Sequence, residues 1–240
     1  MQIEEIKDQI CDVCHKMWQL GWVAANDGNV SVRLEDGTFL ATPTGMSKSF
    51  ITPDKLLRID AKGNVLEGAE GLRPSSEIKM HLRCYEKRAD VNAVVHAHPP
   101  AATGFAVAHR PMDMYNMIED VAAIGAVPLT PYGTPSTTEV PDAIEPYLND
   151  HDVMLLENHG ALPITAWRVW NCGQKSRSTQ SFSAAATILT ARILISSSIS
   201  APTTKLPANT PAIANLSDAK KVSRRTNKET QYAEEHSAYP

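Results

Sequence analysis

Apolar residues near the N-terminus recur every three or four positions, the spacing that places them on one face of an α-helix. The series consists of Ile3, Ile6, Ile10, Val13, Cys14, Trp18 and Leu20. We therefore predict an amphipathic helix over 2–20. This helix contains the string Cys11-Asp-Val-Cys14-His15, which matches a c-type haem attachment motif. The helical periodicity instead favours packing of both thiols in the core.

Short runs of β-branched and apolar residues follow, separated by turn residues, and they predict strands joined in hairpins. Turns at Glu35-Asp36-Gly37 and Ala61-Lys62-Gly63 join the first two pairs. The predicted strands lie within 24–34 and at 38–42, 56–60, 64–67, 92–98, 126–129 and 152–157. Further helices are predicted at 76–88, at 100–108, and from Thr137 or Thr138 to Leu148. Strands and helices do not alternate regularly, so we expect an α/β fold in which helices cover a mostly antiparallel sheet.

Charge is distributed unevenly along the 240 residues, of which 42% are hydrophobic. Residues 1–162 carry 13 Lys and Arg against 23 Asp and Glu, a net charge of −10, whereas 163–240 carry 10 against 4, or +6. A helix is possible over 167–196, and beyond it the chain is rich in Ser, Thr, Pro and Ala. We predict one domain over 1–196 and a flexible tail over 197–240. A diverged tail or a shifted reading frame would produce the acid-poor composition after Pro163.

Several function classes lack support in the sequence. No run of about 18 apolar residues occurs and the N-terminus is charged, so we expect a cytoplasmic protein without a membrane partner. Four scattered cysteines favour free thiols over a disulfide framework. No phosphate-binding P-loop, dinucleotide-binding G-x-G-x-x-G or nucleophile G-x-S-x-G motif occurs. The acidic residues 1–162 carry no basic-aromatic cluster, and nucleic-acid binding would have to rest on Lys220-Lys221 and Arg224-Arg225, so we expect no nucleic-acid partner.

Three histidines are candidates for a metal site. His96 and His98 are two residues apart on a predicted strand, so their side chains leave the same face, and His159 follows another apolar strand. Three imidazoles that leave coordination positions open are typical of catalytic zinc. The alternative is that each histidine has an ordinary structural role.

Small and hydroxylated residues suggest an anion site. Ser75 and Ser76 precede Glu77 at the start of a predicted helix, where hydroxyls and free N–H groups can bind phosphate. Glu77 could then act as a base or metal ligand, or simply interact with the helix dipole. Gly28-Asn29 and Thr44-Gly45 form two more loops whose backbone could approach a phosphate.

Six motifs together resemble the class II aldolase/adducin family, and its fuculose-phosphate aldolase branch above all. They occur in the family's order within about residues 3–162. The motifs are Ala25-Asn26-Asp27-Gly28-Asn29-Val30-Ser31-Val32-Arg33, Thr42-Pro43-Thr44-Gly45, Pro74-Ser75-Ser76-Glu77, Val95-His96-Ala97-His98-Pro99, Pro131-Tyr132-Gly133-Thr134 and Glu157-Asn158-His159-Gly160.

The resemblance implies a three-layer α/β/α fold with a central, mostly antiparallel sheet, and a homotetramer with active sites at subunit interfaces. It implies one Zn²⁺ per subunit, held by His96, His98 and His159, with Glu77 as a further ligand and the acid–base residue. It also implies a sugar-phosphate substrate whose phosphate is bound by the three small-residue loops: Gly28, Asn29, Thr44, Gly45, Ser75 and Ser76.

The activity implied is cleavage of a ketose 1-phosphate, such as L-fuculose 1-phosphate, to dihydroxyacetone phosphate and a small aldehyde. Related aldolases use a tyrosine as general acid. Tyr115 lies near the corresponding position, and Tyr232 and Tyr239 lie toward the C-terminus, but the motifs assign none of them. Within the same fold, a 4-epimerase or a dehydratase is an alternative, although family epimerases have Asp where this chain has Glu77. A non-catalytic, adducin-like interaction domain is the alternative from another class, and it would be expected to lack the metal ligands.

Overall fold

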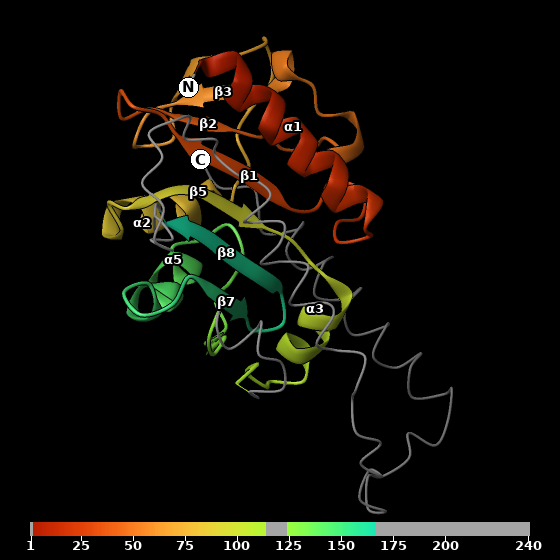
Figure 1. Ribbon diagram of the computed structural model, residues 1–240, viewed down its shortest axis with the longest axis vertical. Coiled ribbons are helices and arrows are strands. Elements are labelled where there is room, and N and C mark those ends of the chain that lie inside the picture. Colours follow the sequence, from red (N-terminus) through yellow and green to blue (C-terminus); the bar gives the residue numbers. More distant parts are fainter. Residues whose placement is uncertain (1, 114–123, 167–240) are drawn as a thin grey trace, which may run out of the picture. The chain divides into compact units, whose positions relative to one another are not determined.

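The computed structural model describes residues 2–113 and 124–166. Figure 1 shows its helices and strands. The α-helices are α1 (Ile3–Gln19), α2 (Ile78–Lys87), α3 (Pro100–Val107) and α5 (Glu139–Ile144), and the 3₁₀ helices are η1 (Lys48–Phe50), η2 (Pro53–Lys55) and η3 (Glu145–Tyr147). The strands are β1 (Asn29–Arg33), β2 (Phe39–Ala41), β3 (Leu57–Ile59), β4 (Val65–Glu67), β5 (Val91–His96), β6 (Leu129–Thr130), β7 (Val153–Leu156) and β8 (Gly160–Ala166).

One sheet connects the described strands, in the order β4-β3-β2-β1-β5-β8-β7-β6. Its neighbours pair antiparallel except for β6 and β7, which are parallel. The expectation of a mostly antiparallel α/β sheet is therefore confirmed. The pairing of β1 with β5 sets Asn29 directly opposite His96, so the motifs that contain these residues meet at one end of the sheet.

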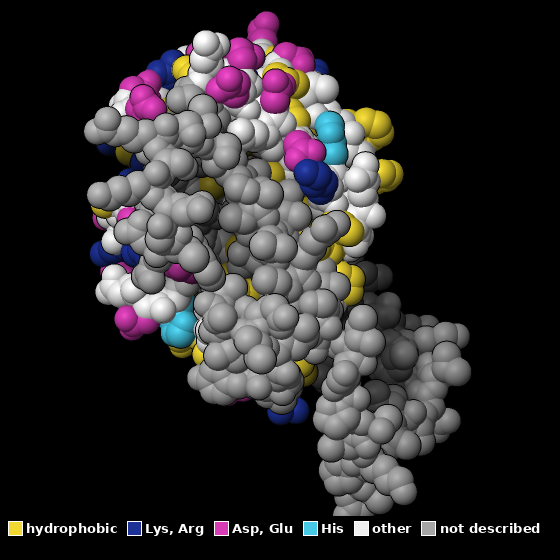
Figure 2. All heavy atoms as spheres, in the orientation of Figure 1, with side chains coloured by type: hydrophobic (Ala, Val, Ile, Leu, Met, Phe, Trp, Pro, Cys, Tyr) yellow, Lys and Arg dark blue, Asp and Glu magenta, His cyan; other side chains and the backbone are white. Residues whose placement is uncertain are grey.

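Helices cover both faces of this sheet, as alternate residues of β1 demonstrate. Val30 and Val32 belong to the core cluster that contains the buried side of α1, whereas the Ser31 hydroxyl between them contacts His81 and Tyr85 of α2. Figure 1 shows α1 in front of β1 and β2. The layers are thus α/β/α, as the resemblance implied. Acidic side chains gather on the surface around α1 (Figure 2), in agreement with the negative charge of residues 1–162.

The structure corrects the predicted elements after Pro100 in three places. The strand expected at 126–129 is Leu129–Thr130, and the helix expected to reach Leu148 ends at Ile144 and continues as η3. The sequence analysis missed β8 altogether, although this strand lies between β5 and β7. The possible helix over 167–196 and the tail boundary at 197 lie outside the described residues.

The N-terminal cysteines lie in the core, as the helical periodicity predicted. Cys11 and Cys14 are buried free thiols on α1, and Cys84 of α2 is a third. Burial raises the pKa of Cys11 to about 11 and that of Cys14 to about 12, which keeps both thiols protonated at neutral pH. Across the described part of the chain, no helix combines the length and apolar character needed to cross a membrane.

Candidate metal centre

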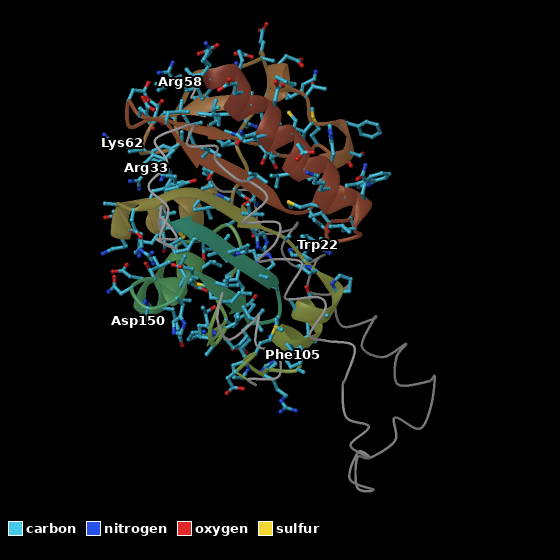
Figure 3. All side chains as sticks on the ribbon, in the orientation of Figure 1. Trp22, Arg33, Arg58, Lys62, Phe105 and Asp150 are labelled. Carbon is cyan, nitrogen blue, oxygen red and sulfur yellow. The ribbon has the colours of Figure 1, made fainter. Side chains whose placement is uncertain are left out.

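His96 and His98 lie where β5 ends. Between them, Ala97 forms a bridge with Ala161 of β8, so the backbone remains extended and both imidazoles leave the same face. Their Nε2 atoms are 3.0 Å apart. The backbone N–H of His98 donates to the carbonyl of Trp22 at 2.8 Å, which fixes the chain just beyond the strand. Figure 3 shows Trp22 at this end of the sheet, near the start of α3.

His159 reaches the same point from the tight loop between β7 and β8. Leu156 pairs with Gly160, Asn158 adopts a left-handed conformation with φ of 56°, and the His159 N–H donates to the Leu156 carbonyl at 3.0 Å. This loop places the His159 ring centroid 4.6 Å from that of His96 and 5.2 Å from that of His98. One ring nitrogen from each of the three histidines lies within 4.8 Å of the other two. The three side chains could therefore hold one metal ion.

Neighbouring groups hold these imidazoles in orientations suited to metal binding. The Nδ1 of His96 lies 3.0 Å from the carbonyl oxygen of Ala161, which makes Nδ1 the protonated nitrogen and leaves a lone pair on Nε2. The Nδ1 of His98 lies 3.7 Å from a carboxylate oxygen of Asp27. The lone pair on His96 Nε2 faces His98 Nε2, so either a proton or a cation must lie between these nitrogens. A bound cation satisfies this requirement.

Burial keeps His96 and His98 neutral, the state in which imidazole binds a metal. It lowers the pKa of His96 to about 3, and it also lowers the pKa of His98, where the nearby His159 acts in the same direction. Both imidazoles therefore carry one proton each and no charge at neutral pH.

Glu77 is the carboxylate beside this cluster. It occupies the N-cap position of α2, but its side chain does not cap the helix. Instead Oε1 lies 3.1 Å from His159 Nε2, and Oε2 accepts a hydrogen bond from Asn29 Nδ2 at 2.9 Å and lies 3.6 Å from His96 Nε2. Burial opposes ionisation of Glu77, but the hydrogen bond with His159, the electrostatic effect of the adjacent imidazoles and the hydrogen bond from Asn29 outweigh it and lower its pKa. Glu77 is therefore a carboxylate that can exchange a proton with a ligand at the cluster.

The three small-residue loops come together next to Glu77. The Asn29 amide also donates to Ser75 Oγ at 3.3 Å, and Ser75 Oγ accepts from the Glu77 N–H at 3.3 Å. A bridge between Pro43 and Pro74, with a 2.8 Å hydrogen bond from Thr44 N to Arg73 O, joins the second and third loops. The structure thus groups Asn29, Thr44 and Ser75, which lie far apart in the sequence.

The remaining loop residues predicted from the sequence have different surroundings. Ser76 Oγ accepts a hydrogen bond from Ser136 Oγ at 2.8 Å, away from Glu77. Gly28 has φ of +72°, and a Cβ there would lie 2.8 Å from the His96 carbonyl oxygen, so only glycine fits. Gly45 has the same φ but open space around its Cα, which leaves its backbone accessible. Tyr115, Tyr232 and Tyr239 lie outside the described residues.

Four residues that the sequence analysis did not assign to the site also contribute to it. Asp27 lies beside His98, and Lys48 is buried beneath the loops. His81, one turn after Glu77 on α2, binds Ser31 Oγ through Nδ1 at 2.7 Å. Gly160 is in contact with the histidines. Asp27 and Gly160 belong to two of the six motifs and His81 lies four residues after Glu77, so each of these had a sequence signal, whereas the role of Lys48 depends on contacts between distant segments.

Gly160 yields a direct prediction. A Cβ at this position would lie 2.5 Å from His98 Cδ2 and 2.6 Å from the carbonyl oxygen of Ala97, distances that real Cβ atoms do not adopt. Gly160→Ala should therefore displace the His98 ring and weaken metal binding by about 10–100-fold, as loss of a supporting contact does in other metal sites. Zinc titration measures this change. Gly104→Ala is the control, because Gly104 of α3 has no left-handed φ and no atom within 4 Å of a built Cβ. Equal zinc affinity in Gly160→Ala and the unmodified chain would contradict the prediction.

Comparison with known proteins agrees with this geometry. A family model described as "Class II Aldolase and Adducin N-terminal domain" matches residues 8–165. The L-fuculose phosphate aldolase of Escherichia coli K12 is 34% identical over 162 residues, covering 68% of this chain and 74% of that protein. The 5-methylthioribulose-1-phosphate/5-deoxyribulose-1-phosphate aldolase of Escherichia coli O45:K1 is 31% identical over 162 residues, covering 68% and 73%.

Solved structures give the same result. An L-fuculose 1-phosphate aldolase superimposes with a TM-score of 0.63 at 28% identity, covering 70% of this chain and 78% of that one. The L-fuculose-1-phosphate aldolase of Thermus thermophilus superimposes with a TM-score of 0.62 at 26% identity, covering 80% and 90%.

Proposed function

The chain belongs to the class II aldolase and adducin family, and from this premise we propose that it is a zinc-dependent aldolase. It would cleave a (deoxy)ketose 1-phosphate to dihydroxyacetone phosphate and a small aldehyde. The observation that carries the proposal is the convergence of His96, His98 and His159 with the Glu77 carboxylate. An adducin-like role without catalysis would not require this arrangement.

The donor set suits zinc. Three imidazoles with no thiolate leave coordination positions open for a substrate, as in catalytic zinc sites. When bound, a zinc ion supplies a Lewis acid that polarises the carbonyl and hydroxyl oxygens of the substrate. The Oδ1 atom of Asn29 is buried and has no hydrogen-bond partner among the described residues, so it is available to a ligand hydroxyl beside the histidines.

Glu77 would move the proton in the reaction. In the cleavage the C4 hydroxyl loses its proton as the C3–C4 bond breaks and the aldehyde carbonyl forms, and the electron pair left on C3 must gain a proton to give dihydroxyacetone phosphate. Glu77 lies within 4 Å of two of the histidines and is held by Asn29, so a substrate at the cluster would place C3 within its reach. In the synthetic direction the same carboxylate would remove that proton.

The loops beside Glu77 would anchor the substrate phosphate. Hydroxyls of Thr44 and Ser75 and the accessible backbone at Gly45 offer neutral donors at one side of the histidines, and Asn29 belongs to the set because its amide holds Ser75 in place. Gly28 and Ser76 belong to the same loops and complete the proposed set. Such an anchor fixes the distance from the phosphate to the reacting carbons.

The identity of the ketose in the substrate is a separate part of the proposal. The two relatives are named for fuculose phosphate and for methylthioribulose and deoxyribulose phosphates, which differ in the ketose rather than in the phosphate group. We propose L-fuculose 1-phosphate as the first substrate to test. The homotetramer with interface active sites and the cytoplasmic location expected from the sequence also belong to this proposal.

An assay on a panel of sugar phosphates tests the proposed function. L-fuculose 1-phosphate, 5-deoxyribulose 1-phosphate and a pentulose 5-phosphate are incubated with the full chain, with and without a chelator, and dihydroxyacetone phosphate is measured. We expect release from a ketose 1-phosphate that stops on chelation and returns when zinc is added. Epimerisation of the pentulose 5-phosphate, without release of dihydroxyacetone phosphate from any substrate, would overturn the aldolase assignment.

A further inference from the structure

Lys48 is a fully buried lysine close to the proposed substrate site. It begins η1, directly after the Thr44–Gly45 loop, and its relative exposure is 1%. Its ammonium group donates to the carbonyl oxygens of Met46 at 3.1 Å and Asn26 at 3.3 Å. Lysine is almost never buried so completely unless its charge has partners. The hydrogen bonds to these two carbonyls therefore stabilise the buried ammonium group of Lys48.

The two carbonyls belong to two different loops of the proposed phosphate site. Asn26 begins the loop that contains Gly28 and Asn29, and Met46 follows Gly45 in the second loop. No backbone hydrogen bond between these two loop segments occurs within the described residues. The Lys48 ammonium thus connects them by donating one hydrogen bond to each.

The remaining contacts close a ring of loops around the site. The second loop is joined to the third by the hydrogen bond from Thr44 N to Arg73 O, and the third is joined to the first by the Asn29–Ser75 hydrogen bond. Among the described groups that make these connections, Lys48 is the one cation; the Asn29 amide also donates to the Glu77 carboxylate at 2.9 Å, and the other partners are neutral. The positive charge therefore lies against two loops that would bind a doubly charged phosphate.

The charges around Lys48 leave part of its positive field uncompensated. Burial lowers its pKa, and Asp27 and Cys14 oppose that effect. The Cys14 thiol is protonated at neutral pH because burial raises its pKa to about 12. Asp27 is 47% exposed at its side chain and also lies beside His98, so water and the imidazole share its charge. A buried cation attracts an anion more strongly than an exposed one, because the surrounding dielectric constant is lower.

We propose that Lys48 is a positioning residue for the substrate phosphate: it holds the Asn26–Asn29 and Thr44–Met46 loops at the spacing the phosphate requires and places a positive charge beneath them. This inference rests on the proposed function, since it assumes that these loops bind phosphate. Lys48 would supply the electrostatic attraction for the phosphate, whereas the hydroxyl and backbone groups of the loops would supply neutral hydrogen-bond donors. A methionine of similar length would fill the same space without the hydrogen bonds or the charge.

Inorganic phosphate is the probe, and calorimetry on the zinc-loaded full chain measures its affinity directly. In Lys48→Met we expect the Kd of phosphate to rise at least tenfold. The KM of the cleaved ketose 1-phosphate should rise by a similar factor, with kcat and zinc content within threefold. Lys48→Arg, which retains the charge and donors, should recover most of the affinity. Lys55→Met is the matched control: Lys55 ends η2, is paired with Asp54 at 3.8 Å and is 39% exposed, and its substitution should leave all four quantities unchanged.

The outcomes separate this inference from the proposed function. If the unmodified chain binds no phosphate, the proposed site is wrong. If it binds phosphate and folded Lys48→Met binds it within twofold, the role of Lys48 is wrong.

Should Lys48→Met fail to fold, the unmodified chain provides the test by NMR. The ammonium signal of Lys48 is observable in lysine labelled with ¹⁵N, because a buried and hydrogen-bonded group exchanges slowly with water, and its absence from Lys48→Arg identifies it. Saturating phosphate should shift this signal together with the amides of Gly28 and Gly45. Shifted amides with an unchanged ammonium signal would overturn the proposal.

Discussion

Replacement of Glu77 by glutamine is expected to lower kcat for ketose 1-phosphate cleavage by about 10²–10⁴-fold, the contribution typical of a positioned acid–base residue. Glutamine has nearly the same size and can still accept a hydrogen bond from Asn29, but it cannot take or return a proton. Since the three imidazoles remain, zinc content should stay near one per chain. Steady-state kinetics and metal analysis of the same preparation measure both quantities.

A second glutamate on the same helix provides the control for this substitution. Glu86 of α2 is exposed and lies 3.6 Å from Arg83, a surface ion pair that contributes little to stability. Glu86→Gln should keep kcat within twofold. If Glu77→Gln retained kcat within threefold, Glu77 would not be the residue that moves the proton.

Removal of one imidazole should have an effect at least as large. In His159→Ala the cluster loses one of three ligands, so zinc should be lost on dialysis. Loss of a Lewis acid that contributes several kcal/mol lowers activity by about 10³-fold or more. Because His159 lies in the loop between β7 and β8, the fold should tolerate the change. Zinc should raise the melting temperature of the unmodified chain but not of His159→Ala, since only a ligand that binds the native state stabilises it.

His151→Ala is the control for the histidine substitution. His151 contacts the carbonyl oxygen of Ala126 through Nδ1 at 3.1 Å and lies outside the cluster. It should retain both zinc and activity. Full zinc binding by folded His159→Ala would contradict the three-histidine site.

Local patterns were enough to predict most of the fold. The helix at the N-terminus follows from apolar spacing, and the two hairpins follow from turn residues between alternating strands, so neither depends on distant contacts. The strand β8 was missed for a physical reason. It contains Pro163, which lacks a backbone donor and weakens any strand prediction, yet Pro163 pairs with Val153 in the middle of the sheet.

In the candidate site too, local motifs predicted some residues, whereas contacts between distant segments could not be predicted. The three histidines and Glu77 were predicted because each belongs to a recognisable motif, and in the structure their side chains lie together. The groups that orient them could not be predicted. The Ala161 carbonyl reaches His96 across 65 residues, and the Lys48 ammonium reaches the Asn26 carbonyl across 22. Such contacts depend on strand register and loop packing, which short motifs do not specify.

Hydrogen exchange into dihydroxyacetone phosphate tests the central claim most directly, because it isolates the proton transfer assigned to Glu77 from the aldehyde and its unassigned general acid. The zinc-loaded chain is incubated with dihydroxyacetone phosphate in deuterated water without an aldehyde, and the hydroxymethyl carbon is followed by NMR. We predict replacement of one of its two hydrogens by deuterium, lost on chelation and in Glu77→Gln. Absence of exchange in the zinc-loaded chain, or undiminished exchange in Glu77→Gln, would contradict the account.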